Sequence, residues 1–305
     1  MERRKPLHYF FITLKGMAMG AADVVPGVSG GTIAFISGIY EELITSINQI
    51  NLSLFKTLRK EGPKAFWTQL NGNFLSALFL GIFISLFSLA TFVSWLLENE
   101  PILLWSFFFG LVLASIFFVG KAIEKWNLGT LIMLVLGAAI AYYITILPPI
   151  ENTASIPFLF LSGALAVCAM ILPGISGAFI LVLLGSYKTI LDAVHERDLT
   201  IVATVAIGAI FGLLSFARLL KWMFNHYKNL TLALLTGFIL GSLNKIWPWK
   251  KVLKTKVFGE KIIPVSEESI SPFTFNGDPQ LMYAVILAIT GFSLIFILEK
   301  IASKK

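Results

Sequence analysis

The stretch from Ala22 to Tyr40 reads ADVVPGVSGGTIAFISGIY and interrupts an apolar run near the start of the chain. It contains a proline, four glycines and an aspartate. Proline lacks a backbone donor and breaks a helix, and glycine permits backbone conformations that other residues avoid. The stretch therefore predicts a helix that is broken inside an apolar region.

A second stretch, from Cys168 to Tyr187, reads CAMILPGISGAFILVLLGSY and repeats this pattern. At one constant offset, residues of the two stretches pair as Gly16 with Gly163, Pro26 with Pro173, Gly27 with Gly174, Ser29 with Ser176, Gly30 with Gly177, Gly38 with Gly185 and Tyr40 with Tyr187. At a second offset, the later pairs are Gly81 with Gly208, Gly110 with Gly237 and Ser115 with Ser242. These pairs predict an internal repeat.

The composition is that of a membrane protein. Of the 305 residues, 57% are hydrophobic and 13% are charged, whereas soluble domains carry about 25% charged residues. The net charge of +7 comes largely from lysines and arginines in short loops, where they set topology, so it does not indicate a nucleic-acid partner. The sequence predicts a polytopic membrane protein.

A transmembrane helix needs about 20 mostly apolar residues. Six segments meet this length: 74–97, 102–120, 129–147, 200–223, 230–247 and 281–299. Two further apolar regions, 7–47 and 157–192, are interrupted by the Pro-Gly breaks, and their arms are too short to cross a hydrocarbon core of about 30 Å. We expect re-entrant helical hairpins with breaks deep in the membrane; two complete spans per region remain the alternative.

The predicted fold is all-α and polytopic, with two repeats at 1–150 and 151–305. Each repeat holds one hairpin and three spans. Because three is odd, the second repeat enters the membrane upside down, which is the inverted-topology arrangement of many transporters.

Loop charges predict the sidedness. Loop 48–73 is basic and is expected in the cytoplasm together with both termini. One segment disagrees: 245–280 is expected outside, yet it carries the basic run KIWPWKKVLKTK.

The motif chemistry favours an anion. We expect a helix to begin at Pro26, because proline suits a first helical turn, and its free N–H groups and dipole attract negative charge. Two such ends would converge on one phosphate. The predicted substrate-binding residues of the motifs are Pro26, Gly27, Ser29, Gly30, Gly31, Thr32, Pro173, Gly174, Ser176 and Gly177. The alternative is that small residues only allow close helix packing, which is the expectation for Gly38 and Gly185.

Charged residues inside apolar segments are costly and often functional. Lys15 and Arg218 are candidate phosphate contacts, unless they extend to the cytoplasmic face. Asp23 and Glu41 are candidate coupling residues for protons or sodium; alternatively, Asp23 caps a helix and Glu41 is solvated. The sequence shows no catalytic or metal-binding spacing, so no further cofactor is expected.

With GMAMGAADVVPGVSGGTIAFISGIYEELI and GALAVCAMILPGISGAFILVLLGSY, nearly the whole chain resembles the PopT-type undecaprenyl-phosphate translocases, a bacterial family of polytopic membrane proteins. The resemblance implies return of undecaprenyl phosphate across the cytoplasmic (inner) membrane for reuse, and it implies no enzyme activity. The family's glycine-rich motifs fall on Pro26 to Thr32 and Pro173 to Gly177.

Three alternatives remain. Undecaprenyl-pyrophosphate phosphatases also have a Pro-Gly-x-Ser motif, but theirs continues with arginine, whereas Gly30 and Gly177 follow the serines here. A small-anion transporter would use the same anion chemistry. A structural membrane protein is disfavoured by the repeat. The sequence leaves the oligomeric state and lipid selectivity open.

Overall fold

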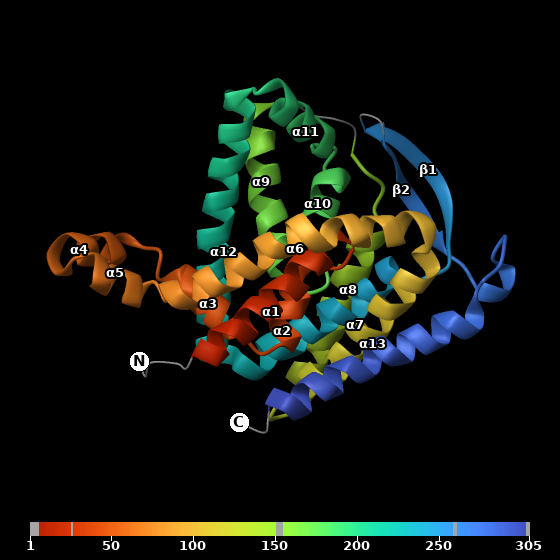
Figure 1. Cartoon of the computed structure of the whole chain (residues 1–305), viewed down its shortest axis with the longest axis horizontal. Helices are drawn as coiled ribbons and strands as arrows, with labels where there is room; N and C mark the ends of the chain where they lie inside the picture. The colour runs from red at the N-terminus through yellow and green to blue at the C-terminus, as the bar shows by residue number, and fades with distance from the viewer. Residues whose placement is uncertain (1–5, 26, 151–154, 259–260, 303–305) are drawn as a thin grey trace.

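The protein is described here by a computed structural model that covers residues 6–25, 27–150, 155–258 and 261–302 (Figure 1). The longer helices are α1 Pro6–Val24, α6 Gly72–Asn99, α7 Pro101–Lys121, α8 Leu128–Ile146, α9 Ile156–Ile171, α12 Leu199–Ser242 and α13 Leu281–Ala302. The shorter helices are α2 Gly30–Ile36, α3 Tyr40–Asn48, α4 Leu52–Glu61, α5 Pro63–Gln69, α10 Gly177–Leu183, α11 Tyr187–Glu196 and the 3-10 helices η1 Leu243–Ile246 and η2 Pro272–Thr274.

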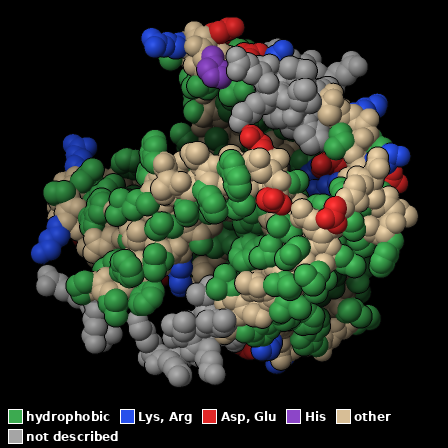
Figure 2. Space-filling view, turned by 45° about the vertical axis from the view of Figure 1, so that its right-hand side comes forward, with side chains coloured by type: hydrophobic (Ala, Val, Ile, Leu, Met, Phe, Trp, Pro, Cys, Tyr) green, Lys and Arg blue, Asp and Glu red, His purple; other side chains and the backbone are tan. Residues whose placement is uncertain are grey.

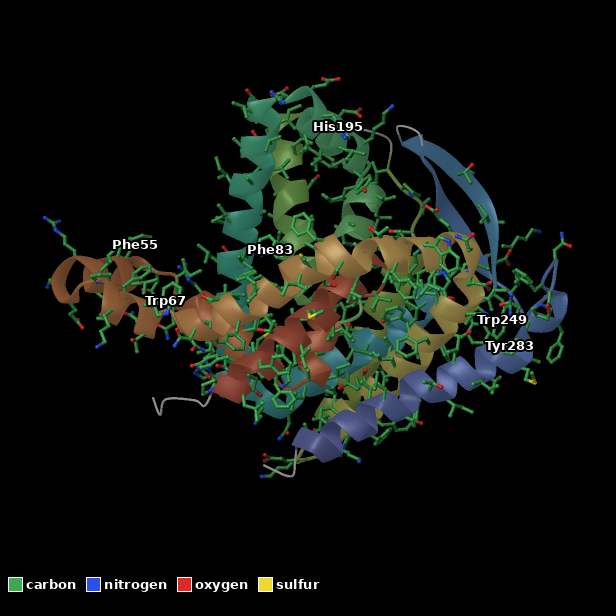
Figure 3. All side chains as sticks on the ribbon, viewed as in Figure 1. Phe55, Trp67, Phe83, His195, Trp249 and Tyr283 are labelled. Carbon is green, nitrogen blue, oxygen red and sulfur yellow. The ribbon has the colours of Figure 1, made fainter. Side chains whose placement is uncertain are left out.

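The chain is a multi-pass helical membrane protein. Four helical stretches of the described residues are long and apolar enough to cross a membrane: Gly72–Asn99, Pro101–Lys121, Leu128–Ile146 and Leu199–Ile246. Large apolar side chains on these helices face outward, as Phe79, Phe83 and Phe87 do on α6. Figure 3 labels Phe83 on this helix. Exposed phenylalanines are stable on such a surface because lipid, not water, surrounds it.

The predicted spans agree with the helices in most places. Spans 74–97, 102–120 and 129–147 lie in α6, α7 and α8, and 281–299 lies in α13. The two spans predicted at 200–223 and 230–247 lie on either side of a kink in α12, where the backbone of Tyr227 is not helical (φ −137°, ψ 45°) and two helices meet. The second of these helices ends at Ser242 and continues into η1. We call the parts before and after Tyr227 the first and second arms of α12.

Each interrupted region folds as one longer helix followed by two short helices. Region 7–47 contains α1, α2 and α3, and region 157–192 contains α9, α10 and α11. A glycine with positive φ lies between the second and third helices of each region: Gly38 (φ +73°) in the first region and Gly185 (φ +69°) in the second. The expectation of a packing position was wrong for Gly38 and stays a prediction for Gly185. Both glycines supply left-handed turn conformations, and a Cβ at Gly38 would meet no atom within 4 Å.

Glycines elsewhere in the repeat pairs allow helices to touch. A Cβ at Gly81 in α6 would collide with the Thr13 carbonyl oxygen in α1, and one at Gly208 in α12 would collide with the Phe160 carbonyl oxygen in α9. In the same way, Gly110 in α7 lies against α13 and Gly237 in the second arm of α12 lies against α8. Helices from the first and second halves of the chain therefore interlock.

The all-α prediction missed one element. Strands β1 Lys250–Phe258 and β2 Lys261–Ser269 form an antiparallel hairpin within the segment expected to be a loop. Valine, threonine, phenylalanine and isoleucine in these runs favour strands. The hairpin lies at one end of the bundle, whereas α4 and α5, which carry Phe55 and Trp67, project from the opposite side (Figures 1 and 3).

The contact of α1 with α6 gives a stability prediction. We expect Gly81→Leu to lower the free energy of unfolding by about 1–3 kcal/mol, because the new side chain overlaps the α1 backbone. Gly120→Leu in α7 is the matched control, since its Cβ would lie 3.9 Å from the nearest atom, Trp126 Cζ2. Thermal unfolding of both purified variants in one detergent measures the difference. Equal unfolding midpoints would contradict so close an approach of α1 and α6.

Candidate functional site

The first break separates α1 from α2. Helix α1 ends at Val24, and Gly27 adopts φ +85°. The helix predicted to begin at Pro26 begins instead at Gly30, with Ser29 in an extended N-cap conformation. Pro26 itself lies outside the described residues. The start moves because Gly27 is left-handed and because the Ser29 hydroxyl accepts from the Gly31 N–H at 3.1 Å, which is a favourable cap.

Asp23 completes this cap from the last turn of α1. Its Oδ1 accepts from the Gly30 N–H at 2.6 Å. The first two amides of α2 therefore donate to side chains of the same motif, Gly30 to Asp23 and Gly31 to Ser29. Asp23 therefore caps the helix that follows the break, which is the alternative role that the sequence suggested for it. Its role in coupling stays a prediction.

The second break has similar backbone geometry. Helix α9 ends at Ile171, Gly174 adopts φ +92°, and α10 begins at Gly177 after Ser176. Ser176 is the N-cap in extended conformation, but its side chain makes no capping hydrogen bond. The two serines of the repeat thus share a backbone position and differ in what their hydroxyls do.

The two breaks touch each other directly. The Gly174 N–H donates to Thr32 Oγ1 at 2.8 Å, and the Ser29 hydroxyl donates to the Met170 carbonyl at 3.1 Å. Ser29 and Thr32 are buried, with 0% and 1% of their surface exposed. The structure therefore brings the two motifs together. The expectation that their amides are free for an anion was wrong for Gly30, Gly31 and Gly174, because buried N–H groups require partners.

A third element closes over both breaks. At Gly174, a Cβ would lie 2.7 Å from Ser242 Oγ at the end of α12. At Gly27, a Cβ would lie 2.7 Å from Cγ of Lys245 in η1. Both glycines are needed here for their positive φ and for this close approach. One turn of chain, from Ser242 to Lys245, therefore packs on the two breaks at once.

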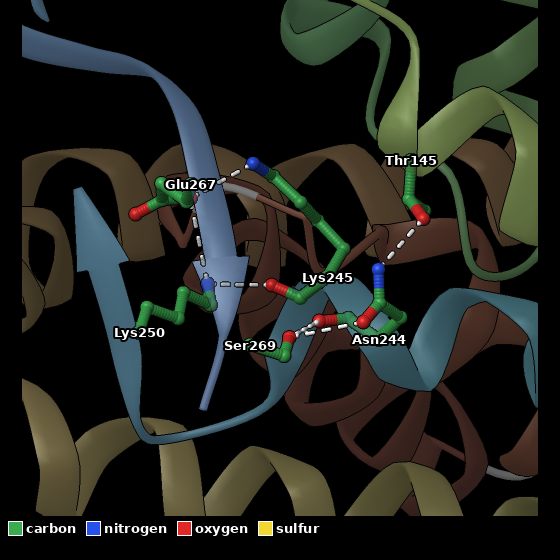
Figure 4. Close-up of polar contacts among 6 residues, drawn as sticks. All are labelled: Thr145, Asn244, Lys245, Lys250, Glu267 and Ser269. Atoms are coloured by element: carbon green, nitrogen blue, oxygen red, sulfur yellow. Dashed lines mark hydrogen bonds and ion pairs between the residues drawn. The ribbon is translucent and has the colours of Figure 1, made fainter. Parts of the chain in front are cut away.

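Lys245 belongs to a cluster that the sequence analysis did not single out. Its ammonium lies 3.0 Å from Glu267 Oε2 in β2, and Lys250 Nζ in β1 lies 3.7 Å from the same oxygen (Figure 4). Lys250 Nζ also donates to the Lys245 carbonyl at 2.6 Å. We call Lys245, Lys250 and Glu267 the lysine cluster. The sequence feature that could have located this cluster is the basic run in segment 245–280, which disagreed with the positive-inside rule.

Aromatic rings line the lysine cluster. Lys250 Nζ lies 4.0 Å from the centroid of the Trp105 ring in α7, and Lys245 Nζ lies 4.9 Å from that of Phe179 in α10. The side chains of the cluster are 9–16% exposed. Burial raises the pKa of Glu267, but the two lysines outweigh it and hold that pKa below its usual value. Figure 2 shows acidic and basic side chains gathered at the middle of one face, with large hydrophobic areas around them.

The remaining predicted residues lie away from the contacts between the breaks. Lys15 Nζ donates to the Ser37 carbonyl at 2.6 Å, at the C-terminal end of α2, where a cation is favourable. Arg218 is exposed on the first arm of α12, one turn before Lys221, which donates to Thr45 Oγ1 in α3. Glu41 is exposed in the first turn of α3.

Metal binding has no support in the described part of the chain. Within residues 6–25, 27–150, 155–258 and 261–302, no three His, Cys, Asp or Glu side chains lie close enough together to hold an ion.

Comparison with known proteins identifies relatives. A family model described as undecaprenyl phosphate translocase-like matches residues 19–261. The chain is 46% identical, over 98% of its length and 99% of the relative, to a polyprenyl-phosphate transporter of Vibrio cholerae serotype O1. It is 33% identical, over 77% of its length and 85% of the relative, to a polyprenyl-phosphate transporter of Staphylococcus aureus. No solved structure matches the chain significantly.

These findings confirm the resemblance inferred from the two motifs. The matched residues include both breaks and the first two members of the lysine cluster, Lys245 and Lys250. The names of the family and of both relatives describe transporters, so the expectation that the chain is not an enzyme is confirmed. Because the family model and the nearly full-length relative agree, the chain belongs to the undecaprenyl phosphate translocase-like family.

Proposed function

We propose that the chain moves undecaprenyl phosphate from the outer to the inner leaflet of the bacterial cytoplasmic membrane, which returns the lipid carrier for reuse. The relatives' names support a polyprenyl phosphate as substrate. One observation carries the mechanism: two broken helices meet inside a hydrophobic bundle, with the Gly174 amide on the Thr32 hydroxyl. Broken helices that meet in this way are a common transporter site.

The substrate sets the physical problem. A polyprenyl chain is stable in the hydrocarbon core, and only the phosphate head needs shelter. In this proposal the head passes along the two breaks while the chain stays in lipid. The amides of Gly30, Gly31 and Gly174 are paired in the conformation described here, and the proposal takes this conformation as a closed state. The head group replaces the Thr32 and Ser29 contacts when the two tips separate.

We further propose the inverted repeat as the basis of alternating access. Matching glycines support it: Gly27 and Gly174 share one backbone conformation, and Gly38 and Gly185 share another. Gly81 and Gly208 pair in the repeat, and each packs against the first helix of its own half, α1 and α9 respectively. Separation of one tip from the other would then open the site to one leaflet at a time, with both termini in the cytoplasm and segment 245–280 outside.

The proposal includes proton or sodium coupling through Asp23 and Glu41. It also includes phosphate contacts from Lys15 and Arg218. A small-anion transporter is the second candidate, because the same amides and hydroxyls suit any oxyanion. The motif departs from that of the phosphatases at Gly30 and Gly177, which supports binding without hydrolysis.

Translocation in proteoliposomes tests the proposal. We expect the full-length chain to accelerate movement of labelled undecaprenyl phosphate between leaflets, and we expect no flux of inorganic phosphate or chloride. A pH gradient imposed across the membrane reports proton coupling. Flux of the small anions without movement of the lipid would favour the second candidate and contradict the proposal.

Asp23 can be tested for capping and coupling separately. Asp23→Asn keeps an oxygen that accepts from the Gly30 N–H but removes the titratable charge, whereas Asp23→Ala removes both. If Asp23 carries a coupling proton, we expect Asp23→Asn to fold normally and to lose the response of lipid transport to the pH gradient. Asp23→Ala should also lose about 1 kcal/mol of stability.

Asp198→Ala is the matched control for this test. Asp198 caps α12 by accepting from Thr200 N and Ile201 N, and it is exposed at a loop. A gradient response that Asp23→Asn retains in full would assign Asp23 to capping alone.

A further inference from the structure

The lysine cluster has an excess of positive charge. Lys245 and Lys250 both reach one oxygen, Glu267 Oε2, at 3.0 and 3.7 Å. Two cations thus share one carboxylate, in a place where Lys250 is only 9% exposed. Buried charges are unfavourable unless they are paired, so one carboxylate compensates the pair only in part.

The surroundings of the cluster suit an amphipathic anion. The rings of Trp105 and Phe179 lie against the two ammonium groups and supply apolar surface beside them. A phosphate monoester carries about −1.5 to −2 charges and three terminal oxygens. It can therefore accept from both ammonium groups at once, with charge-assisted hydrogen bonds that a single shared carboxylate oxygen does not match.

The position of Lys245 connects the cluster to both breaks. Its side-chain stem lies against Gly27 in the first break, and its ammonium lies over Phe179, in the first turn of the helix that follows the second break. Ser242, one turn earlier, lies against Gly174. A head group that moves along the breaks therefore meets this ammonium.

The hairpin that carries Glu267 is held to the bundle at its base. The Ser269 hydroxyl donates to Asn244 Oδ1 at 2.9 Å (Figure 4). Just after β2, the Ile270 carbonyl accepts from Trp247 Nε1 at 2.8 Å. The Glu267 side chain is 16% exposed, so its carboxylate already has some contact with solvent, and in the proposal it leaves the lysines by rotation about its own bonds.

We propose that Lys245 and Lys250 bind the phosphate of the polyprenyl phosphate on the side of the membrane where segment 245–280 lies, and that Glu267 is the resident counter-ion that the phosphate displaces. This inference rests on the proposed function and names the groups that recognise its substrate. The competing explanation is a structural ion pair that only fastens the hairpin to the bundle.

Binding to the purified full-length chain in detergent tests the site. The probe is farnesyl phosphate, a short polyprenyl phosphate, measured by isothermal titration calorimetry. We expect Lys245→Gln and Lys250→Gln each to weaken binding about tenfold or more, the effect of one lost charge-assisted hydrogen bond. We expect Glu267→Gln to strengthen binding severalfold, because the phosphate no longer competes with a carboxylate.

The hairpin itself offers matched controls. Lys251 and Glu268 face each other across the two strands, next to the cluster but exposed. Lys251→Gln and Glu268→Gln should leave binding within about twofold of the wild-type value. Thermal unfolding of every variant establishes that it is folded, and the Lys245→Gln, Glu267→Gln double variant removes one lysine together with the carboxylate.

The outcomes separate the two explanations. A structural ion pair predicts that Glu267→Gln weakens binding as the lysine variants do, and that the double variant recovers; either result would overturn the proposal. Phosphate recognition predicts tighter binding by Glu267→Gln and weak binding by the double variant. Inorganic phosphate should bind more weakly than farnesyl phosphate, and equal affinities would overturn the assignment to a lipid head group.

Transport separates this inference from the proposed function. If the wild-type chain translocates undecaprenyl phosphate and the two lysine variants do so at the same rate, the inference fails and the function stands. If the wild-type chain does not translocate the lipid, yet farnesyl phosphate binding depends on both lysines, the function fails and the binding site stands.

Lys250 also gives the site a dependence on pH. Burial lowers the pKa of Lys250 to about 8, although Glu267 opposes this shift. Among the side chains that the structure describes, the charged groups that face it are Lys245 and Glu267, and α7 presents the Trp105 ring. The affinity for farnesyl phosphate should fall as the pH rises through about 8, because Lys250 loses its proton while the phosphate, with a second pKa of about 6, keeps its charge.

Lys250→Arg is the matched variant, since arginine keeps its charge throughout this range. We expect its affinity to stay constant between about pH 7 and 9. A wild-type affinity that is also constant over this range would remove Lys250 from the site.

Discussion

The need to pair backbone donors inside an apolar bundle governs this structure. At each break the chain leaves the helix where neither water nor a regular hydrogen-bond ladder is at hand, so side chains supply the partners. Asp23 and Ser29 satisfy the start of α2, and Thr32 satisfies Gly174 in the other break. The second motif thus depends on the first for its hydrogen bonding, which explains why two breaks so far apart in sequence form one unit.

This pairing changes where the positive charge for a head group comes from. Helix ends attract anions through unsatisfied amides, and here those of Gly30, Gly31 and Gly174 are satisfied. The cations beside the breaks come instead from η1 and β1, in Lys245 and Lys250. An anion that enters between these breaks must therefore compete with partners that the amides and lysines already have.

The sequence predicted the features that depend on local chemistry. Proline and glycine located both breaks, and hydropathy located α6, α7, α8 and α13. Where a helix begins depends on competing caps, so the start of α2 moved from Pro26 to Gly30. The contact of Lys245 with Gly27 joins residues remote in sequence, and no periodicity or motif encodes it. The hairpin of β1 and β2 was missed because its lysines were read as loop charges.

Those lysines also explain the one disagreement with the positive-inside rule. The rule counts solvated cations that resist crossing the membrane. Lys245 and Lys250 are mostly buried and share Glu267, so they are not solvated loop charges and carry little topological information. A resident carboxylate suits the proposed phosphate site in a transporter. Two buried cations that bind a phosphate tightly would be left without a partner when it departs. Glu267 returns to them at that moment, which lowers the free energy of the empty site and makes release of the head group as feasible as its capture.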